Sequence, residues 1–320
     1  MTIKRWLSMA CLAVLGALML TFILWAFFKA EVMMFVMLYI KAFGGQPNPI
    51  PIDGHFSKFS LLVMSFDARE LPLKAFISHY SQCSSVGEIV VVWNKGDPPL
   101  PQLFDSHVPV RVRVEPVNSM NNRFKPDPEL KHRGVLLLDD DILMSCADIE
   151  FGFAKWRQHP ERITGFYARL LEGDVPNYRC THCEMHTYSM GHYNIVLAGA
   201  SFLDSSLVFQ AYSAPENKPG REYVDQVFNC DDLLVNYLMA SQLGRDSQHA
   251  QWVRPHKRVD VGRLTSTRLS GAHDVEPVRH QCTEDFAALF GNPMKNRSYP
   301  LDFMGLRRPV CLGYLGCMYI

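Results

Sequence analysis

The segment that most constrains the fold is an apolar run, Val135–Leu138, followed directly by three acidic residues, Asp139, Asp140 and Asp141. A short uninterrupted apolar run is typical of a β-strand that is buried on both faces, as in a sheet covered by helices on each side. The sequence therefore predicts an α/β protein, with this strand inside the sheet and the acidic turn at its carboxyl end.

The acidic turn is a candidate metal site. In open α/β sheets, ligands bind at the carboxyl ends of strands, where the connecting loops diverge. Three neighbouring carboxylates repel one another unless a positive group joins them. A hard divalent cation that bridges to phosphate oxygens is a natural partner, because Mg²⁺ and Mn²⁺ prefer oxygen ligands. A solvated acidic turn with no ligand is the alternative.

Strand and helix patterns alternate along the chain. Residues 60–66 and 88–93 are predicted strands with a helix at 71–80 between them, which makes a βαβ unit and indicates a parallel sheet. Further strands are expected at 108–114, 135–138, 163–167 and 194–198, and helices at 148–157, with Asp148 as a cap, and at 231–243.

The N-terminal region contains 23 residues without a charge, 6–28. At ~1.5 Å per residue such a helix crosses the ~30 Å hydrocarbon layer. A cleaved signal peptide is the alternative, but its apolar region is usually only ~7–15 residues long. Lys4 and Arg5 favour a cytosolic N-terminus. We expect a cytosolic tail at 1–5, a transmembrane signal anchor at 6–28, a stem or linker at 29–57 and a lumenal domain at 58–320.

Charge and cysteine content bear on the compartment. The 32 Lys and Arg balance the 32 Asp and Glu, which argues against a disordered chain and against a nucleic-acid partner. Cys11 lies in the predicted anchor, and the other eight cysteines form an even set that fits an oxidising lumen. These eight are Cys83, Cys146, Cys180, Cys183, Cys230, Cys282, Cys311 and Cys317. A glycosylation sequon at Asn296 is compatible with the Golgi or the endoplasmic reticulum.

Polar side chains follow two more of the predicted strands. Asn94 follows the strand at 88–93, and Asn118 and Arg123 follow the strand at 108–114. Asparagine suits a base or a sugar hydroxyl, and the arginine fork suits a phosphate. Each alone is ordinary turn chemistry, but their recurrence after successive strands favours a ligand site.

Several spaced motifs together resemble glycosyltransferase family 64, which includes the C-terminal domain of the exostosins and the exostosin-like proteins. In chain order they are Ile89–Asn94, Asn118–Arg123, Leu138–Asp141, Gly165-Phe166, Gly199–Phe202 and Asn229–Asp232. The resemblance covers about residues 58–290. It implies a GT-A glycosyltransferase fold, with a Rossmann-like nucleotide-binding half and an acceptor-binding half. It also implies a nucleotide-sugar donor, Mn²⁺, and transfer with retention at the anomeric carbon.

The same resemblance implies roles for individual residues. Asp141 would bind the metal, Asp232 would be the catalytic carboxylate, and Arg279 would be the catalytic-site arginine. Cys230 and Cys282 match the disulfide of the family. The residues that would bind the nucleotide sugar are Arg69, Asn94, Asn118, Arg123, Asp139, Asp140 and Asp231. The segment Met64–Arg69 departs from the family pattern, so Arg69 matches the nucleotide-binding arginine of the family only to within one residue.

The residues around Asp231 and Asp232 also have an interpretation of their own. Both can cap a helix that begins at Leu233, which is a sufficient structural role for Asp231. A carboxylate beneath an anomeric carbon can instead stabilise an oxocarbenium-like transition state. Arg279 and the metal would then stabilise the departing diphosphate.

A second cluster of polar residues, Cys180–His186 with His192 nearby, is similar to a zinc-binding sequence. A structural zinc site needs four ligands in a settled geometry. A disulfide through Cys180 or Cys183, and free thiols, are the alternatives. Cys311 and Cys317 are expected to pair.

Two segments, Met64–Arg69 and Tyr80–Val86, look closer to the plant members of the family than to the animal heparan-making ones. This implies a UDP-GlcNAc-like donor, or a mannose donor, and a glycan or glycolipid acceptor such as an inositol phosphorylceramide. The alternatives are a heparan-type N-acetylhexosaminyltransferase, a nucleotide-sugar hydrolase and a non-catalytic lectin-like subunit. A homo-oligomer is compatible with the sequence.

Overall fold

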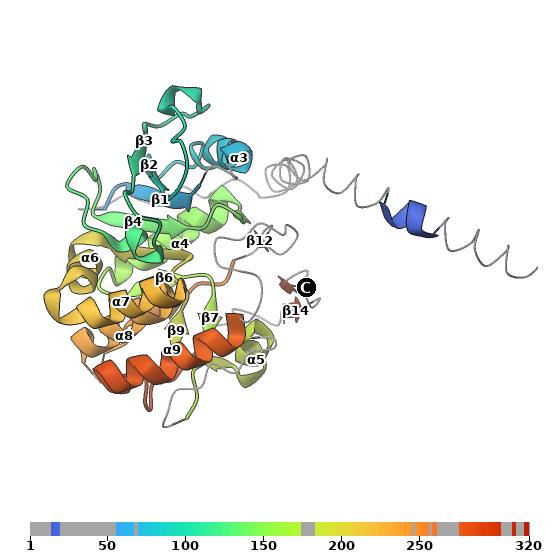
Figure 1. Cartoon of the computed structure of the whole chain (residues 1–320). Helices are drawn as coiled ribbons and strands as arrows, with labels where there is room; N and C mark the ends of the chain where they lie inside the picture. Colours follow the sequence, from blue (N-terminus) through green and yellow to red (C-terminus); the bar gives the residue numbers. More distant parts are fainter. Residues whose placement is uncertain are drawn as a thin grey trace, which may run out of the picture.

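The computed structural model describes most of the predicted lumenal domain (Figure 1). The described residues are 14–19, 56–66, 70–173, 183–244, 247–255, 258–260, 275–301, 309–311 and 317–319. Residues 14–19 are helical, and the rest of the expected anchor at 6–28 lies outside the described residues. No helix among these ranges is both long enough and apolar enough to cross a membrane.

A seven-stranded sheet forms the centre of the domain. Its strands, in spatial order, are β11 (Ala250–Trp252), β6 (Ile163–Gly165), β10 (Ala200–Asp204), β4 (Gly134–Leu138), β1 (Phe59–Ser65), β2 (Val86–Trp93) and β3 (Val110–Val114). Strands β4, β1, β2 and β3 are parallel neighbours. The helix α3 (Glu70–Tyr80) connects β1 to β2, so the predicted βαβ unit is confirmed.

Strand β10 runs against the direction of its two neighbours, β4 and β6. Ala200 at its start pairs with Leu138 at the end of β4. The start of β10 therefore lies beside the acidic turn. The expected strand at 194–198 is shorter than predicted, since only β9 (Ile195–Val196) is extended there, and the expected strand at 163–167 ends at Gly165.

Helices cover both faces of the sheet, as the apolar run at 135–138 predicts. Leu136 and Leu138 pack with α3 and α4 (Cys146–Gln158) on one face. Val135 and Leu137 pack on the other face with α6 (Ser205–Ser213), α7 (Lys218–Val227), α8 (Asp231–Leu243) and α9 (Val275–Phe290). Since successive residues of a strand point to opposite faces, the alternation shows a three-layer α/β arrangement (Figure 1).

The remaining elements are short. They are the helices α5 (Cys183–Met190), η2 (Pro101–Leu103), η3 (Met120–Phe124) and η4 (Pro215–Asn217), and the strand pairs β5 (Ile142–Met144) with β12 (Arg258–Asp260), β7 (Ala168–Arg169) with β9, β8 (His192–Tyr193) with β13 (Tyr299–Pro300), and β14 (Pro309–Cys311) with β15 (Cys317–Tyr319). The register of the last pair sets Cys311 opposite Cys317, as their expected pairing requires.

The start of α4 corrects one expectation. Ser145, not Asp148, is the N-cap, because the Ser145 hydroxyl accepts a hydrogen bond from the backbone N–H of Asp148. Asp148 lies within the first turn, where its carboxylate accepts a hydrogen bond from the same hydroxyl at 2.7 Å. Cys146, the first residue of α4, forms a disulfide with Cys83 and so joins α4 to the turn that follows α3.

Candidate active site

The acidic turn lies at the carboxyl end of β4, beside the end of β1. The Ser65 hydroxyl, in the last residue of β1, donates a hydrogen bond of 2.7 Å to Oδ2 of Asp140. Asp140 is buried between these strands, whereas Asp141 beside it is half-buried. The first strand therefore fixes the middle carboxylate of the turn, which the sequence pattern alone did not indicate.

Asp139 is held by the start of β10. Its backbone N–H donates to the carbonyl of Gly199 at 2.8 Å. A Cβ atom at Gly199 would lie 2.2 Å from Oδ2 of Asp139, so residue 199 must lack a side chain for this approach. The Asp139 side chain remains 38% exposed. The turn therefore presents a carboxylate to solvent from a fixed backbone.

The carboxylate oxygens of this turn suit a hard cation that also binds a ligand. Among the described residues, no group of three His, Cys, Asp or Glu side chains is placed to hold a metal alone. Mg²⁺ and similar ions are, however, commonly held by one or two carboxylates together with substrate phosphates and water. Asp141 and its neighbours fit that arrangement and do not form an all-protein cage.

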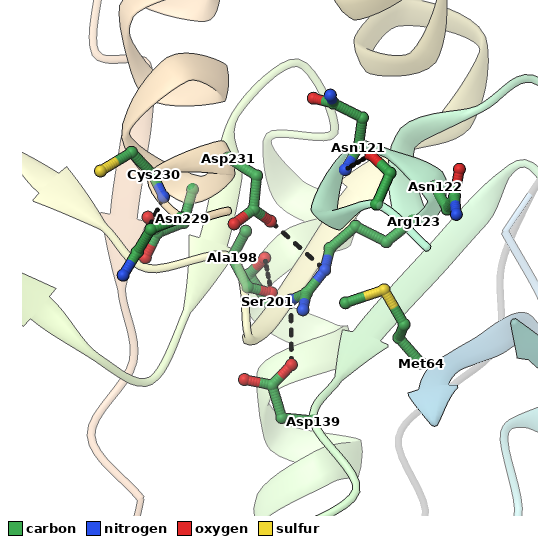
Figure 2. Close-up of polar contacts among 12 residues, drawn as sticks. Met64, Asn121, Asn122, Arg123, Asp139, Ala198, Ser201, Asn229, Cys230 and Asp231 are labelled. Atoms are coloured by element: carbon green, nitrogen blue, oxygen red, sulfur yellow. Dashed lines mark hydrogen bonds and ion pairs between the residues drawn. The ribbon is translucent and has the colours of Figure 1, made fainter. Parts of the chain in front are cut away.

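Arg123 reaches the turn from η3. Its Nη1 donates to Oδ1 of Asp139 at 2.9 Å, and its Nε lies 3.3 Å from Oδ2 of Asp231 in α8 (Figure 2). Burial lowers the pKa of Arg123, but the charges of Asp139, Asp231 and Asp232 outweigh it and raise the pKa above its usual value. The guanidinium is therefore a permanent positive charge between two acidic segments that are far apart in the sequence.

The start of α8 differs from the expected capping arrangement. The helix begins at Asp231, as the predicted helix at 231–243 does, and not at Leu233, as the capping interpretation requires. No side chain caps its first turn. Cys230 precedes it in the left-handed backbone region, with φ of 73°. The Asn229 side chain accepts a hydrogen bond of 2.7 Å from the backbone N–H of Cys230. Since the turn at 229–230 starts the helix, the Asp231 and Asp232 carboxylates are available for other partners.

Asp232 is clamped by an arginine from α9. Nη2 of Arg279 lies 2.9 Å from Oδ1 and 2.7 Å from Oδ2 of Asp232, and Nη1 donates to Oδ1 of Asn229 at 3.2 Å. Cys282, three residues later on the same face of α9, forms a disulfide with Cys230. This disulfide therefore brings Arg279 against the start of α8, and the pairing that the resemblance implied is confirmed.

Asp231 has a different electrostatic environment from its neighbour. Burial raises its pKa; Arg123 opposes the rise, and the charges of Asp232 and Asp139 add to it, so that the pKa reaches about 7. Arg279 makes a further, smaller opposing contribution. The adjacent carboxylates of Asp231 and Asp232, each beside an arginine, thus form one largely buried charge network. It consists of Asp139–Arg123–Asp231, whose contacts Figure 2 shows, and of Asp232–Arg279.

The two asparagines that were predicted to bind the nucleotide, Asn94 and Asn118, lie near η3 but differ in burial. Asn94 is buried; its side-chain amide donates to the carbonyl of Ser119 at 3.0 Å, and its Oδ1 accepts from Asn122 at 2.8 Å. Asn94 therefore supports η3 from the end of β2. Asn118, just before η3, is exposed.

A model of the glycosyltransferase family 64 domain matches residues 59–305 of this chain. The chain belongs to glycosyltransferase family 64. The match covers the whole central sheet, both acidic segments and α9, so the site described above lies entirely within the family domain.

Relatives within this family include plant and animal proteins. The chain is 46% identical over 242 residues to "Glucosamine inositolphosphorylceramide transferase 1" of Oryza sativa subsp. indica, covering 75% of this chain and 32% of that protein. It is 31% identical to human "Exostosin-like 2", covering 67% of this chain and 66% of that protein. It is 29% identical to "Glycosylinositol phosphorylceramide mannosyl transferase 1" of Arabidopsis thaliana, covering 75% and 74%. The chain spans about a third of the length of the first of these relatives, and the expected likeness to plant members is confirmed.

Several residues that were predicted to have a role lie away from the two acidic segments or outside the described residues. Arg69 and Cys180 lie outside the described residues, as does the side chain of Cys183. Two histidines of the predicted zinc-binding cluster are among the described residues. His186 contacts Glu172 at 3.0 Å, and His192 contacts the carbonyl of Met190. Asn296 is exposed, as a glycosylated asparagine must be.

Three site residues of this family member were not predicted individually: Ser65, Gly199 and Asn229. Ser65 and Gly199 support the acidic turn, and Asn229 accepts hydrogen bonds at the start of α8. Gly199 and Asn229 lie within the motifs that resemble the family, and Ser65 ends the first predicted strand. Their position at the ends of strands or before a helix was the available signal.

Proposed function

We propose that this chain is a retaining, Mn²⁺-dependent glycosyltransferase with a GT-A fold. It would transfer an amino sugar, or a related hexose, from a UDP-sugar to a glycolipid that carries an inositol phosphate. The observation that carries the proposal is the buried charge network, because it joins a carboxylate turn suited to a metal diphosphate to a second carboxylate, Asp232, held by Arg279.

The acidic turn would hold the sugar donor. Asp141 would bind Mn²⁺, and Asp139 and Asp140 would orient the sugar and nucleotide. When bound, the metal would supply Lewis-acid stabilisation of the leaving diphosphate. Arg69, Asn94 and Asn118 are proposed to position the nucleotide, Asn94 through its support of η3.

Asp232 would stabilise positive charge at the anomeric carbon. In a retaining transfer on one face of the sugar, the acceptor oxygen forms the new bond as the bond to the diphosphate oxygen breaks, and the acceptor proton passes to the leaving phosphate. A fixed carboxylate near the anomeric carbon lowers the energy of the oxocarbenium-like transition state. Both Nη atoms of Arg279 contact Asp232 or Asn229, so we assign Arg279 the role of orienting Asp232.

The acceptor class rests on the relatives. Two of those reported above are named for transfer to inositol phosphorylceramides. A membrane lipid acceptor is consistent with the uncharged run at 6–28, which we propose is a type II anchor in the Golgi or endoplasmic reticulum. The disulfides Cys83–Cys146 and Cys230–Cys282 support a lumenal location for the domain.

A screen of sugar donors against acceptors tests this function. The 320-residue chain, purified in detergent, is incubated with Mn²⁺, UDP-GlcNAc, UDP-GalNAc or GDP-mannose, and glycosylated inositol phosphorylceramides, and products are identified by mass spectrometry. The expected result is an acceptor whose mass increases by one sugar, with release of the donor's nucleoside diphosphate, UDP or GDP, that depends on the acceptor. Equal release of that nucleoside diphosphate with and without acceptor would indicate a hydrolase.

A matched pair of variants controls this screen. Asp232→Asn removes the proposed catalytic charge. Asp204→Asn removes a buried carboxylate that is also paired with an arginine, Arg133, but at the opposite end of β4 and β10. Transfer is expected to be lost in the first variant and kept in the second.

A further inference from the structure

Arg123 lies between the two acidic segments of the site. Its Nη1 donates to Asp139 at 2.9 Å, its Nε lies 3.3 Å from Asp231, and its side chain is only 8% exposed (Figure 2). Asp139 follows β4, and Asp231 begins α8. A single side chain from a third element, η3, therefore spans the gap between the proposed sugar-donor end and the proposed catalytic end.

The short helix that carries Arg123 is fixed on two sides. On the side of the sheet, the Asn122 side chain donates to Oδ1 of Asn94 at 2.8 Å and to the carbonyl of Val117 at 2.8 Å. On the side of the helices, the Asn121 side chain donates to the carbonyl of Arg221 in α7 at 2.9 Å and accepts from the Tyr212 hydroxyl of α6 at 2.6 Å. Because these amides are buried and hydrogen-bonded, η3 is a rigid base for the guanidinium.

The charges show why a cation is needed at this place. Asp139, Asp231 and Asp232 all act electrostatically on Arg123. Asp232 already has Arg279 at 2.7 Å. Without Arg123, the buried Asp231 carboxylate would face Asp232 and Asp139, whose charges repel it. Asp231 would then take up a proton, or the start of α8 and the acidic turn would move apart, and in both cases the cation that joins the two segments would be lost.

We propose that Arg123 is a positioning residue, which sets the distance between the acidic turn and the start of α8 by holding Asp139 and Asp231 together. The expected effect of Arg123 on the rate of sugar transfer rests on the proposed function. The positioning role differs from the role of a nucleotide-sugar ligand, which the family resemblance implies for this position. A positioning residue acts through the two carboxylates, so its removal affects the reaction step more than the affinity for UDP.

Kinetic measurements on Arg123→Gln and Arg123→Lys separate the two roles. In Arg123→Gln we expect kcat to fall about 100-fold, the usual effect of misplacing reacting groups by about 1 Å, and the Kd for UDP with Mn²⁺ to change less than about threefold. Lysine keeps the charge with a single point of contact, so Arg123→Lys should recover about tenfold of the lost rate. A rise in the Kd for UDP that matches the loss of kcat/KM would overturn the proposal, and so would an unchanged kcat.

A double-mutant cycle tests whether Arg123 acts through Asp231. Asp231→Asn should reduce kcat less in the Arg123→Gln background than in the wild type, because the contact that it breaks is already absent. Equal losses in both backgrounds would count against the bridge. Arg133→Gln and Arg133→Lys are matched controls: Arg133 also pairs with a buried aspartate, Asp204, and both changes should leave kcat within about twofold.

Hydrogen exchange gives a readout that does not require activity. In Arg123→Gln, the amides of 139–142 and of 231–234 should lose protection together, whereas in Arg133→Gln neither group should change. If the wild-type chain transferred no sugar but this joint loss occurred, the proposed function would fail while the bridge would stand. If only one group, or neither group, lost protection, Arg123 would not join the two segments. Should Arg123→Gln not fold, Arg123→Lys gives the same comparison with a smaller expected change.

Discussion

The two acidic segments of the site are built differently. The turn after β4 presents Asp139 with 38% of its side chain exposed, on a backbone that β1 and β10 hold from either side. At the start of α8, the Asp231 and Asp232 side chains are only 5% and 12% exposed, and each faces its own arginine. Arginines therefore lie against both carboxylates of α8, whereas Asp139, although it shares Arg123 with Asp231, keeps oxygen atoms accessible to a ligand. This difference fits the proposed roles, in which the turn binds the sugar donor and Asp232 in α8 takes part in the reaction.

The largest expected effect is that of Asp232→Asn. Asparagine keeps the shape of the side chain but removes the charge that would stabilise the transition state. We expect kcat to fall about 10³-fold, within the range seen when one preorganised electrostatic group is removed. Steady-state kinetics on the 320-residue chain measure it. A kcat within about tenfold of the wild type would remove Asp232 from the reaction.

A substitution in the acidic turn should lower activity less than Asp232→Asn does, and it should also change the dependence of the rate on Mn²⁺. Asp141→Asn is expected to lower kcat/KM about 100-fold at a fixed Mn²⁺ concentration and to raise the Mn²⁺ concentration that gives half-maximal rate. Thermal unfolding should change little, since Asp141 is half-buried in a turn. An unchanged Mn²⁺ requirement would show that another group binds the metal.

The two disulfides found among the described residues can be compared, because their removal should cost a similar free energy of unfolding. They close segments with sequence separations of 63 and 52 residues, so replacing either pair with alanine should cost about 4 kcal/mol in the free energy of unfolding. Only Cys230–Cys282 adjoins the site. We expect the folded Cys230→Ala/Cys282→Ala protein to lose about tenfold in kcat.

The folded Cys83→Ala/Cys146→Ala protein is the matched control and should stay within about twofold of the wild-type kcat, because this disulfide joins α3 to α4 away from Asp232. Activity is normalised to the folded fraction, measured by urea unfolding at the assay temperature. Equal losses of kcat in the two proteins would mean that the disulfide at α8 serves stability alone.

The smallest effect concerns pH. The pKa of Asp231 is raised to about 7 by burial and by the neighbouring Asp232 and Asp139, against the opposing charges of Arg123 and Arg279; an unfolded aspartate has a pKa of about 3.9. Between these values the folded protein binds the proton more tightly than the unfolded chain does. The contribution of Asp231 to the free energy of unfolding therefore falls as the pH rises from about 4 to 7, and this loss of stability is complete above pH 7.

Asp231→Asn does not titrate and removes this pH dependence. The melting temperature of the variant minus that of the wild type should therefore be larger at pH 8 than at pH 5, by several degrees, as expected for a contribution on the order of 1–3 kcal/mol. Differential scanning calorimetry at the two pH values measures it. The same difference at both pH values would show that Asp231 is ionised throughout.

The central sheet was largely predictable from the sequence, because the signals are local. The apolar runs in β1, β2 and β4 and the pattern of α8, whose bounds at 231–243 agree with the prediction, depend on neighbouring residues only. Strand β10 (Ala200–Asp204) was not predicted, and its antiparallel direction depends on strand pairing across the sheet, which a local pattern does not show.

The contacts within the site were less predictable. The motifs indicated which acids matter, but not that Arg123 bridges Asp139 to Asp231, because that contact joins three elements distant in sequence. The capping role expected for Asp231 was wrong because Asp231 is itself the first residue of the helix, preceded by Cys230 in the left-handed region, and no side chain caps the first turn. Eight cysteines allow 105 complete pairings, so Cys83–Cys146 could come only from the folded chain.

The division of roles between the two acidic segments can be tested by measuring UDP binding and sugar transfer on the same two variants. Isothermal titration calorimetry with UDP and Mn²⁺ is combined with the transfer assay for Asp141→Asn and Asp232→Asn. We predict that Asp141→Asn loses Mn²⁺-dependent UDP binding and transfer together, whereas Asp232→Asn binds UDP within about twofold of the wild type and loses transfer. Wild-type UDP binding by Asp141→Asn, or loss of binding by Asp232→Asn in proportion to its loss of transfer, would contradict it.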